Sequence, residues 1–132
     1  MSSGRWLLAA AAALAAAAHA WASPDAVRGE QVYARCLACH ALAVDRVGPR
    51  HCGLFGRLAG SVPGFAYSEA LKKSKIVWND KTLDRFLAKP LAMVPGTAMT
   101  YDGVPDPAER ADLIAYLRRA NEASPCSGRA RE

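Results

Sequence analysis

Cys36-Leu37-Ala38-Cys39-His40 is the stretch of the chain that decides its fold and its chemistry. This Cys-x-x-Cys-His pattern is typical of covalent haem attachment. Two thiols about one helical turn apart can bond to the two vinyl groups of one porphyrin, and a histidine directly after the second thiol can bind the iron. We therefore predict that Cys36 and Cys39 hold a haem c covalently and that His40 is an axial ligand of its iron.

Two other interpretations of these thiols stay open. A zinc knuckle could recruit His51 and Cys52, because Cys-x-x-Cys pairs are common in tetrahedral zinc sites. A thioredoxin-like dithiol has the same spacing, but that motif lies near a βαβ pattern, and no run of β-branched residues precedes Cys36. The motif and its setting favour haem over both.

The N-terminal segment has the pattern of a secretory signal peptide. Arg5 precedes an unbroken apolar stretch at residues 6–18, and Ala20-Trp21-Ala22 offers a small-residue cleavage site. The apolar stretch is shorter than the roughly 20 residues that cross a bilayer. We expect cleavage after Ala22, with residues 1–22 as the signal peptide and residues 23–132 as one mature domain in the periplasm. An uncleaved segment that tethers the same domain to the membrane is the alternative.

Size and charge narrow the class of protein. Residues 23–132 are enough for one domain and too few for two. A domain of this size buries roughly 65% of its unfolded surface, so a large apolar cofactor at its centre would add to a modest core. The formal net charge of the whole chain is +5. Its basic residues are scattered and form no patch with aromatic residues, which argues against nucleic-acid binding.

The sequence pattern predicts an all-α fold. Asp25 can cap a helix that runs into the Cys36–His40 turn. Further helices are expected at residues 68–75, at 79–88 before Pro90, and at 107–120, where Asp106-Pro107 supplies the cap and the first-turn proline. Residues 41–63 are dense in glycine and proline, which indicates an irregular loop. No segment indicates a sheet.

The order of the motifs resembles that of a class I monohaem cytochrome c, mitochondrial-type or bacterial c2-like. The resemblance implies the fold of that class, with short helices and irregular loops wrapped around one covalently bound haem. It covers nearly all of the chain after the signal segment, in family order, through residues 36–40, 47–49, 53–57, 64–68, 78, 95–99 and 110–117.

The resemblance also implies the second axial ligand. Pro95-Gly96-Thr97-Ala98-Met99 matches the family segment that carries it. Met99 is therefore expected to bind the iron opposite His40, and Thr97 to belong to the haem site. Met93 lacks the Pro-Gly-Thr context. A thioether ligand favours ferrous iron and so raises the reduction potential relative to two nitrogen ligands.

Further contacts of the haem are implied by the same resemblance. Pro49 matches the proline whose carbonyl accepts the ring proton of the axial histidine. Arg57, Tyr67 and Trp78 match positions that hydrogen-bond the haem propionates or offset their charge. Phe86 stands where many members have a tyrosine whose hydroxyl contacts the ligand sulfur, so that hydrogen bond is expected to be missing. The contact between the first and last helices is expected to involve Gly29, Tyr33, Leu113 and Tyr116.

Cys52 and Cys126 are left over once two thiols carry the haem. In an oxidising compartment surplus cysteines often pair. The family fold could bring the loop after Pro49 near the end of the last helix. A disulfide between Cys52 and Cys126 is therefore expected, and two free thiols are the alternative.

The function that the resemblance implies is electron transport, not catalysis. Both axial positions would be filled, and no nucleophile, base or oxyanion constellation is apparent. The implied partners are redox proteins that dock transiently with a monomer: a cytochrome bc1-type complex or a dehydrogenase as donor, and an oxidase, reductase or photosynthetic reaction centre as acceptor. Leu91, Ala92 and Ala98 stand where mitochondrial members have lysines, which leaves the acceptor open. A peroxidase or gas sensor whose Met99 dissociates, and a structural zinc module, remain alternatives.

Overall fold

The computed structural model describes residues 22–128. The predicted signal peptide, residues 1–22, lies outside the described residues except for Ala22. Between residues 22 and 128 the chain forms α-helices and irregular loops without a strand, and one isolated antiparallel bridge joins Leu58 to Val77. The predicted all-α fold is confirmed. None of the helices in this range is long and apolar enough to span a membrane.

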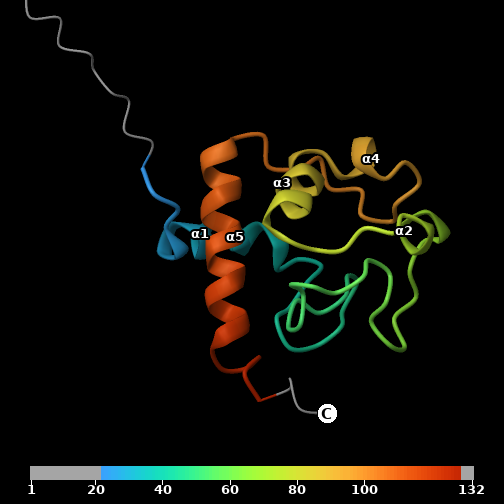
Figure 1. Ribbon diagram of the computed structural model, residues 1–132, viewed down its shortest axis with the longest axis horizontal. Coiled ribbons are helices and arrows are strands. Elements are labelled where there is room, and N and C mark those ends of the chain that lie inside the picture. Colours follow the sequence, from blue (N-terminus) through green and yellow to red (C-terminus); the bar gives the residue numbers. More distant parts are fainter. Residues whose placement is uncertain (1–21, 129–132) are drawn as a thin grey trace, which may run out of the picture.

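Helices α1 (Ala26–Tyr33) and α5 (Pro107–Glu122) cross each other on one side of the domain (Figure 1). The side chain of Asp25 accepts hydrogen bonds from two backbone N–H groups in the first turn of α1, and the side chain of Asp106 caps α5. Both helices begin where the sequence predicts. α5 continues to Glu122, beyond the predicted end at residue 120.

Gly29 allows these two helices to approach each other closely. A Cβ atom at this position would lie 1.9 Å from the carbonyl oxygen of Asp112, so no larger side chain fits without a shift of the backbone. Beside it, the rings of Tyr33 and Tyr116 pack with their centroids 5.0 Å apart. Leu113, on the same face of α5, is 1% exposed. The helix contact thus involves the four residues that the family resemblance implied.

Three short helices follow in the middle of the chain: α2 (Glu69–Lys73), α3 (Asp80–Ala88) and α4 (Pro90–Met93). Ser68 caps α2, and Asn79 caps α3 with a reciprocal capping box. α2 and α3 lie within the predicted ranges, although α2 ends earlier than expected. α4 was not predicted. Pro90 follows the end of α3 as expected, but it is also the first residue of α4, because the fixed φ of proline suits the first position of a helix.

Residues 41–63 form the irregular loop that their glycines and prolines predict; in Figure 1 they are the teal and green segment below α3. The loop is attached to the end of α5. The side-chain oxygen of Asn121 accepts a hydrogen bond from the Gly53 N–H at 2.7 Å, and its side-chain nitrogen donates to the His51 carbonyl at 3.1 Å. Next to these contacts a disulfide joins Cys52 to Cys126.

The apolar core lies between α1, α3 and α5 and continues into the loop. Its buried members from these helices include Val32, Tyr33, Leu83, Phe86, Leu87, Leu113, Ile114 and Leu117. Because several of these side chains also face a central cavity, the core and the candidate site share one wall.

Candidate functional site

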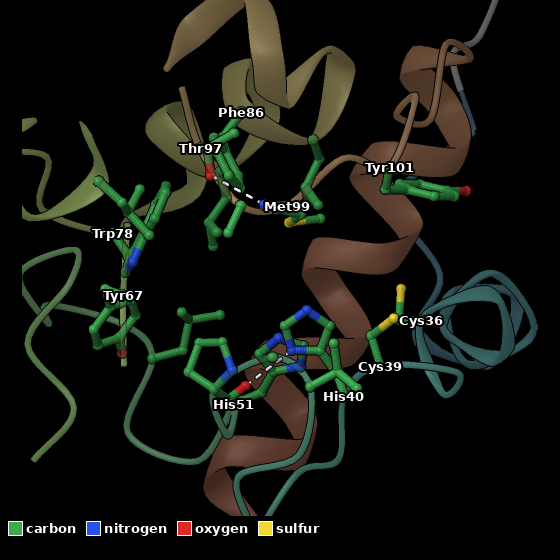
Figure 2. Close-up of a pocket in the computed structure, with 18 of the residues that line it drawn as sticks. Cys36, Cys39, His40, His51, Tyr67, Trp78, Phe86, Thr97, Met99 and Tyr101 are labelled. Atoms are coloured by element: carbon green, nitrogen blue, oxygen red, sulfur yellow. Dashed lines mark hydrogen bonds between the residues drawn. The ribbon is translucent and has the colours of Figure 1, made fainter. Parts of the chain in front are cut away.

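A cavity of about 280 Å³ opens in the middle of the domain (Figure 2). Its walls come from the end of α1, the loop after His40, helices α3 and α5, and residues 97–101. Most of the lining is apolar: Leu54, Leu71, Leu83, Phe86, Leu87, Leu113 and Leu117. Such a lining suits a large, flat and mostly apolar group.

His40 is held firmly on one wall of this cavity. Its backbone N–H donates to the Cys36 carbonyl at 2.9 Å, and its ring Nδ1 lies 2.9 Å from the Pro49 carbonyl oxygen. The hydrogen bond at Nδ1 leaves Nε2 for another partner. Burial lowers the pKa of His40, although the Pro49 contact acts in the opposite direction. The lowered pKa favours the neutral imidazole, which is the form that binds a metal.

Gly48 makes room for the His40 ring. A Cβ atom at Gly48 would lie 2.2 Å from Cε1 of that ring. The backbone next to Pro49 thus forms a cradle that only glycine allows, and the carbonyl that accepts from Nδ1 belongs to the same turn.

Cys36 and Cys39 lie at the edge of the cavity, near Tyr101 (Figure 2). Both are free thiols; Cys36 is half-buried and Cys39 is exposed. The 3-10 turn Ala34–Cys36 continues α1 and brings the two thiols to the same rim as His40.

Met99 and Thr97 lie on the wall opposite His40 (Figure 2). The Thr97 hydroxyl oxygen accepts a hydrogen bond from the Met99 backbone N–H at 3.3 Å, which fixes the backbone that carries the thioether. Phe86 is buried on the same wall and packs against Trp78, with ring centroids 5.0 Å apart. As the sequence indicates, Phe86 brings no hydroxyl to this wall.

Arg57, Tyr67 and Trp78 also line the cavity. Tyr67 and Trp78 lie on the side away from the two thiols (Figure 2). The Arg57 guanidinium donates to the backbone carbonyls of Cys52 and Arg50 at 3.1 and 3.0 Å, and no carboxylate among residues 22–128 forms a salt bridge with it. Burial lowers the pKa of Arg57 and raises the pKa of Tyr67. A half-buried guanidinium without a salt-bridge partner fits an anionic group in the cavity.

His51 has a place in the site that sequence reasoning missed. Its ring stacks on the His40 ring, with centroids 4.3 Å apart and planes inclined by 22°, and its Nδ1 lies 3.0 Å from the Tyr33 hydroxyl oxygen. Burial lowers the pKa of His51 to about 3, and electrostatic interactions with His40 and Arg57 act in the same direction. The sequence held no signal for this arrangement, because His51 lies outside every motif of the predicted haem site.

The zinc knuckle that would use His51 and Cys52 is not supported. Cys52 is bonded to Cys126, so its thiolate is not available to a metal. In the described part of the chain, no group of three or more His, Cys, Asp or Glu side chains is arranged to hold a metal ion. A haem, by contrast, fits these residues. The lining is apolar, the His40 ring packs against Gly48, two thiols lie at the edge, and the half-buried Arg57 guanidinium forms no salt bridge with a described carboxylate.

Comparisons with known proteins agree with this geometry. Residues 26–121 match the sequence profile of the family described as Cytochrome c. The chain belongs to the cytochrome c family. It is 47% identical to cytochrome c2 of Rhodomicrobium vannielii over 109 residues, which cover 80% of this chain and 87% of that protein. It is 44% identical to cytochrome c2 of Blastochloris viridis over 111 residues, 82% of this chain and 87% of that one.

A solved structure is similar as well. Cytochrome cH from Methylobacterium extorquens superposes with a TM-score of 0.70 at 44% identity, and the match covers 72% of this chain and 98% of that chain. Membership of the cytochrome c family confirms the predicted class I monohaem cytochrome c. The protein is thus an electron carrier with one covalently bound haem c, not an enzyme, and it exchanges electrons with other redox proteins.

Proposed function

We propose that the protein is a periplasmic one-electron carrier in which Cys36 and Cys39 bind the haem through thioethers and His40 and Met99 are its axial ligands. When bound, the haem supplies a one-electron couple between ferric and ferrous iron. One observation carries the proposal: the neutral His40 imidazole and the Met99 thioether lie on opposite walls of one apolar cavity, with both thiols at its edge.

Each of these side chains has a second residue that holds it in place. The Pro49 carbonyl orients the His40 ring and makes it a better donor, because it draws on the Nδ1 proton. Thr97 fixes the backbone of Met99. The apolar walls exclude water, which favours the less charged, ferrous state of the site.

Arg57, Tyr67 and Trp78 are proposed to receive the haem propionates. The Arg57 guanidinium offers a positive charge that is not neutralised by a carboxylate, and Figure 2 shows the Trp78 indole nitrogen on the side toward Tyr67. A buried carboxylate needs such donors, because burial without them is costly.

Export to the periplasm rests on the sequence pattern of residues 1–22, with cleavage after Ala22. The disulfide between Cys52 and Cys126 supports this location, because disulfides persist in oxidising compartments. The proposed donor is a cytochrome bc1-type complex or a dehydrogenase. The proposed acceptor is an oxidase, a reductase or a reaction centre, and the carrier itself acts as a monomer.

Docking is proposed at the mouth of the cavity, around Cys39 and Tyr101. Cys39, Val47 and Tyr101 are exposed, uncharged residues there, and Val47 is 77% exposed. Next to them the exposed Arg46 guanidinium donates to the Leu37 carbonyl at 2.6 Å. Arg35 is neutralised by Glu109 through two contacts of 2.6 and 2.8 Å. A mouth with few unpaired charges favours a partner with an apolar, uncharged patch at its own redox centre, and the encounter rate should then depend weakly on salt.

A pair of methionine variants tests the ligand set. In Met99→Ala the ferric protein is expected to lose the weak far-red absorption band of methionine-bound haem iron, and the reduced protein to bind carbon monoxide rapidly. Met93→Ala, which removes the other methionine of this segment, is expected to keep the band. The covalent haem should remain in both variants. A colourless wild-type protein, or a band that survives in Met99→Ala, would overturn the proposal.

The docking mode is tested by oxidising the reduced carrier with hexacyanoferrate(III), an anion, and with a cationic cobalt(III) complex over a range of ionic strength. If the mouth of the cavity carries few unpaired charges, the oxidation rate should depend only weakly on ionic strength for both oxidants. Steep slopes of opposite sign would show that charge governs the approach and would refute this part of the proposal.

A further inference from the structure

His51 is not needed to bind haem iron, yet its side chain contacts both the Tyr33 hydroxyl and the His40 ring. Its ring lies between the Tyr33 hydroxyl and the His40 ring, so it connects α1 to the proposed axial ligand. The family resemblance assigned no role to this position. Its place in the structure requires an explanation that the proposed ligand set does not provide.

The Pro49 hydrogen bond alone leaves one motion of the His40 ring free. It fixes the ring at Nδ1, next to the covalent attachment at Cγ, and the far side of the ring can still tilt about the line through these two atoms. A second planar ring that lies nearly parallel at 4.3 Å opposes this rotation, because a turned His40 ring would strike it edge-on.

We infer that His51 is a positioning residue that sets the plane of the His40 imidazole through ring stacking, with the Tyr33 hydroxyl holding the His51 ring in register. This inference rests on the proposed function, since it takes His40 to be an axial ligand. The plane of an axial imidazole governs its overlap with the iron orbitals, and so the distribution of unpaired electron density over the porphyrin in the ferric state.

The His51 ring can do this because its own backbone is fixed at several points. The His51 N–H donates to the Ala41 and Leu42 carbonyls at 3.2 and 3.0 Å, and the His51 carbonyl accepts from Asn121 at 3.1 Å. The next residue, Cys52, is bonded to Cys126, which lies beyond the end of α5. The stack is therefore supported by the loop, by α1 and by α5 together.

The test compares proton NMR spectra of the ferric holoprotein, in which the shifts of the haem methyl groups respond to the plane of the axial imidazole together with the orientation of the methionine ligand. His51→Leu keeps the side-chain bulk but removes the flat ring, and it is expected to change the order and the spread of the methyl shifts. His51→Phe keeps a ring for stacking and is expected to stay closer to the wild type. Tyr33→Phe removes only the hydroxyl and is expected to shift the pattern in the same sense as His51→Leu, by less.

Tyr116→Phe is the matched control, because it removes a hydroxyl from the ring that packs on Tyr33 and does not touch His51. A purely structural role for His51 would lower the unfolding midpoint of its variants and leave the methyl pattern as it is. The inference is overturned if haem-loaded His51→Leu has the wild-type pattern. Should His51→Leu fail to incorporate haem, identical patterns in Tyr33→Phe and Tyr116→Phe would overturn it.

The same spectra separate this inference from the function on which it rests. Strongly shifted signals from the His40 ring and from the Met99 methyl group in the wild type test the ligand set. If these signals are missing, the proposed ligands are wrong. If they are present and the His51 variants leave the methyl shifts unchanged, the role of His51 alone is wrong.

Discussion

Cys52 and Cys126 are bonded to each other across a sequence separation of 74 residues, with their Cα atoms 5.0 Å apart. Both side chains are buried, at 5% and 4% exposure. The bond fastens the loop beneath the cavity to the chain beyond α5, next to the two hydrogen bonds of Asn121. The loop that carries His51 is thus closed covalently as well as by contacts.

Removal of this bond is expected to destabilise the protein without loss of haem. In a Cys52→Ala/Cys126→Ala variant, the free energy of unfolding should fall by about 4 kcal/mol, the chain-entropy value for a loop of this length. Urea unfolding of the holoprotein measures the difference. A reductant should lower the stability of the wild type and leave the double variant unchanged. Two reactive thiols in denatured, unreduced wild-type protein would contradict the bond itself.

Gly29→Ala is expected to separate α1 from α5. The new Cβ atom would meet the Asp112 carbonyl and the Tyr116 side chain, and neither the backbone of α5 nor its neighbours can yield easily. We expect a net loss of about 1–3 kcal/mol in unfolding free energy, even though alanine favours a helix over glycine by about 1 kcal/mol.

Gly128→Ala is the control for this substitution, because a Cβ atom at Gly128 meets nothing within 4 Å. Thermal unfolding followed by circular dichroism compares the two variants. A Gly29→Ala protein as stable as Gly128→Ala would show that the helices do not approach as closely as described.

Asp112 should make stability depend on pH. Its carboxylate accepts from the Arg28 guanidinium at 2.8 Å and from the Asp25 backbone N–H at 2.6 Å, and the Arg28 hydrogen bond is the main cause that lowers the pKa of Asp112 below 3.8. A lowered pKa in the folded state means that this stabilisation is present above the unfolded value and is lost as the pH falls through the folded one.

Asp112→Asn is therefore expected to cost about 1–2 kcal/mol near neutral pH. The difference from the wild type should shrink as the pH falls below about 4. Asp80→Asn, which removes an exposed partner of Arg118, should change little at any pH. Urea unfolding at several pH values measures these differences. If the difference in unfolding free energy between Asp112→Asn and the wild type grows toward acid pH, this account is wrong.

Phe86→Tyr tests the wall beside Met99. A hydroxyl that donates to the thioether withdraws electron density from the sulfur, which weakens its bond to ferric iron. The reduction potential is expected to rise by about 20–60 mV, the equivalent of one net hydrogen bond, and Met99 should be displaced more easily by added imidazole. Phe55→Tyr adds the same hydroxyl beside Arg118, away from the cavity, and should leave both properties unchanged. Equal potentials for the two variants would refute the prediction.

Local sequence signals were sufficient for most of the helices. Asp25 and Asp106 each cap the helix that they were expected to cap, because a capping side chain acts on the N–H groups next to it. α4 was missed, since Pro90 was interpreted only as the end of α3 and not as the start of a new turn.

Contacts between distant segments were accessible only where a family pattern supplied them. The His40–Pro49 contact and the crossing at Gly29 came from the resemblance. The His40–His51 stack did not, because it depends on how the loop folds back after Gly48 and no local rule relates two histidines at that spacing. The ion pair of Arg35 with Glu109 is equally invisible in the sequence, since a surface arginine finds its partner only after α1 and α5 have met.

The four cysteines must reach two different chemical states while the protein matures. All four cysteines of the chain lie in one domain, where Cys52 is bonded to Cys126 and where Cys36 and Cys39 are the proposed attachment points of the haem. If the domain is exported as proposed, Cys36 and Cys39 must either escape oxidation to a disulfide or be reduced again before the haem is attached. The order of oxidation and haem insertion then becomes a condition for the yield of mature protein.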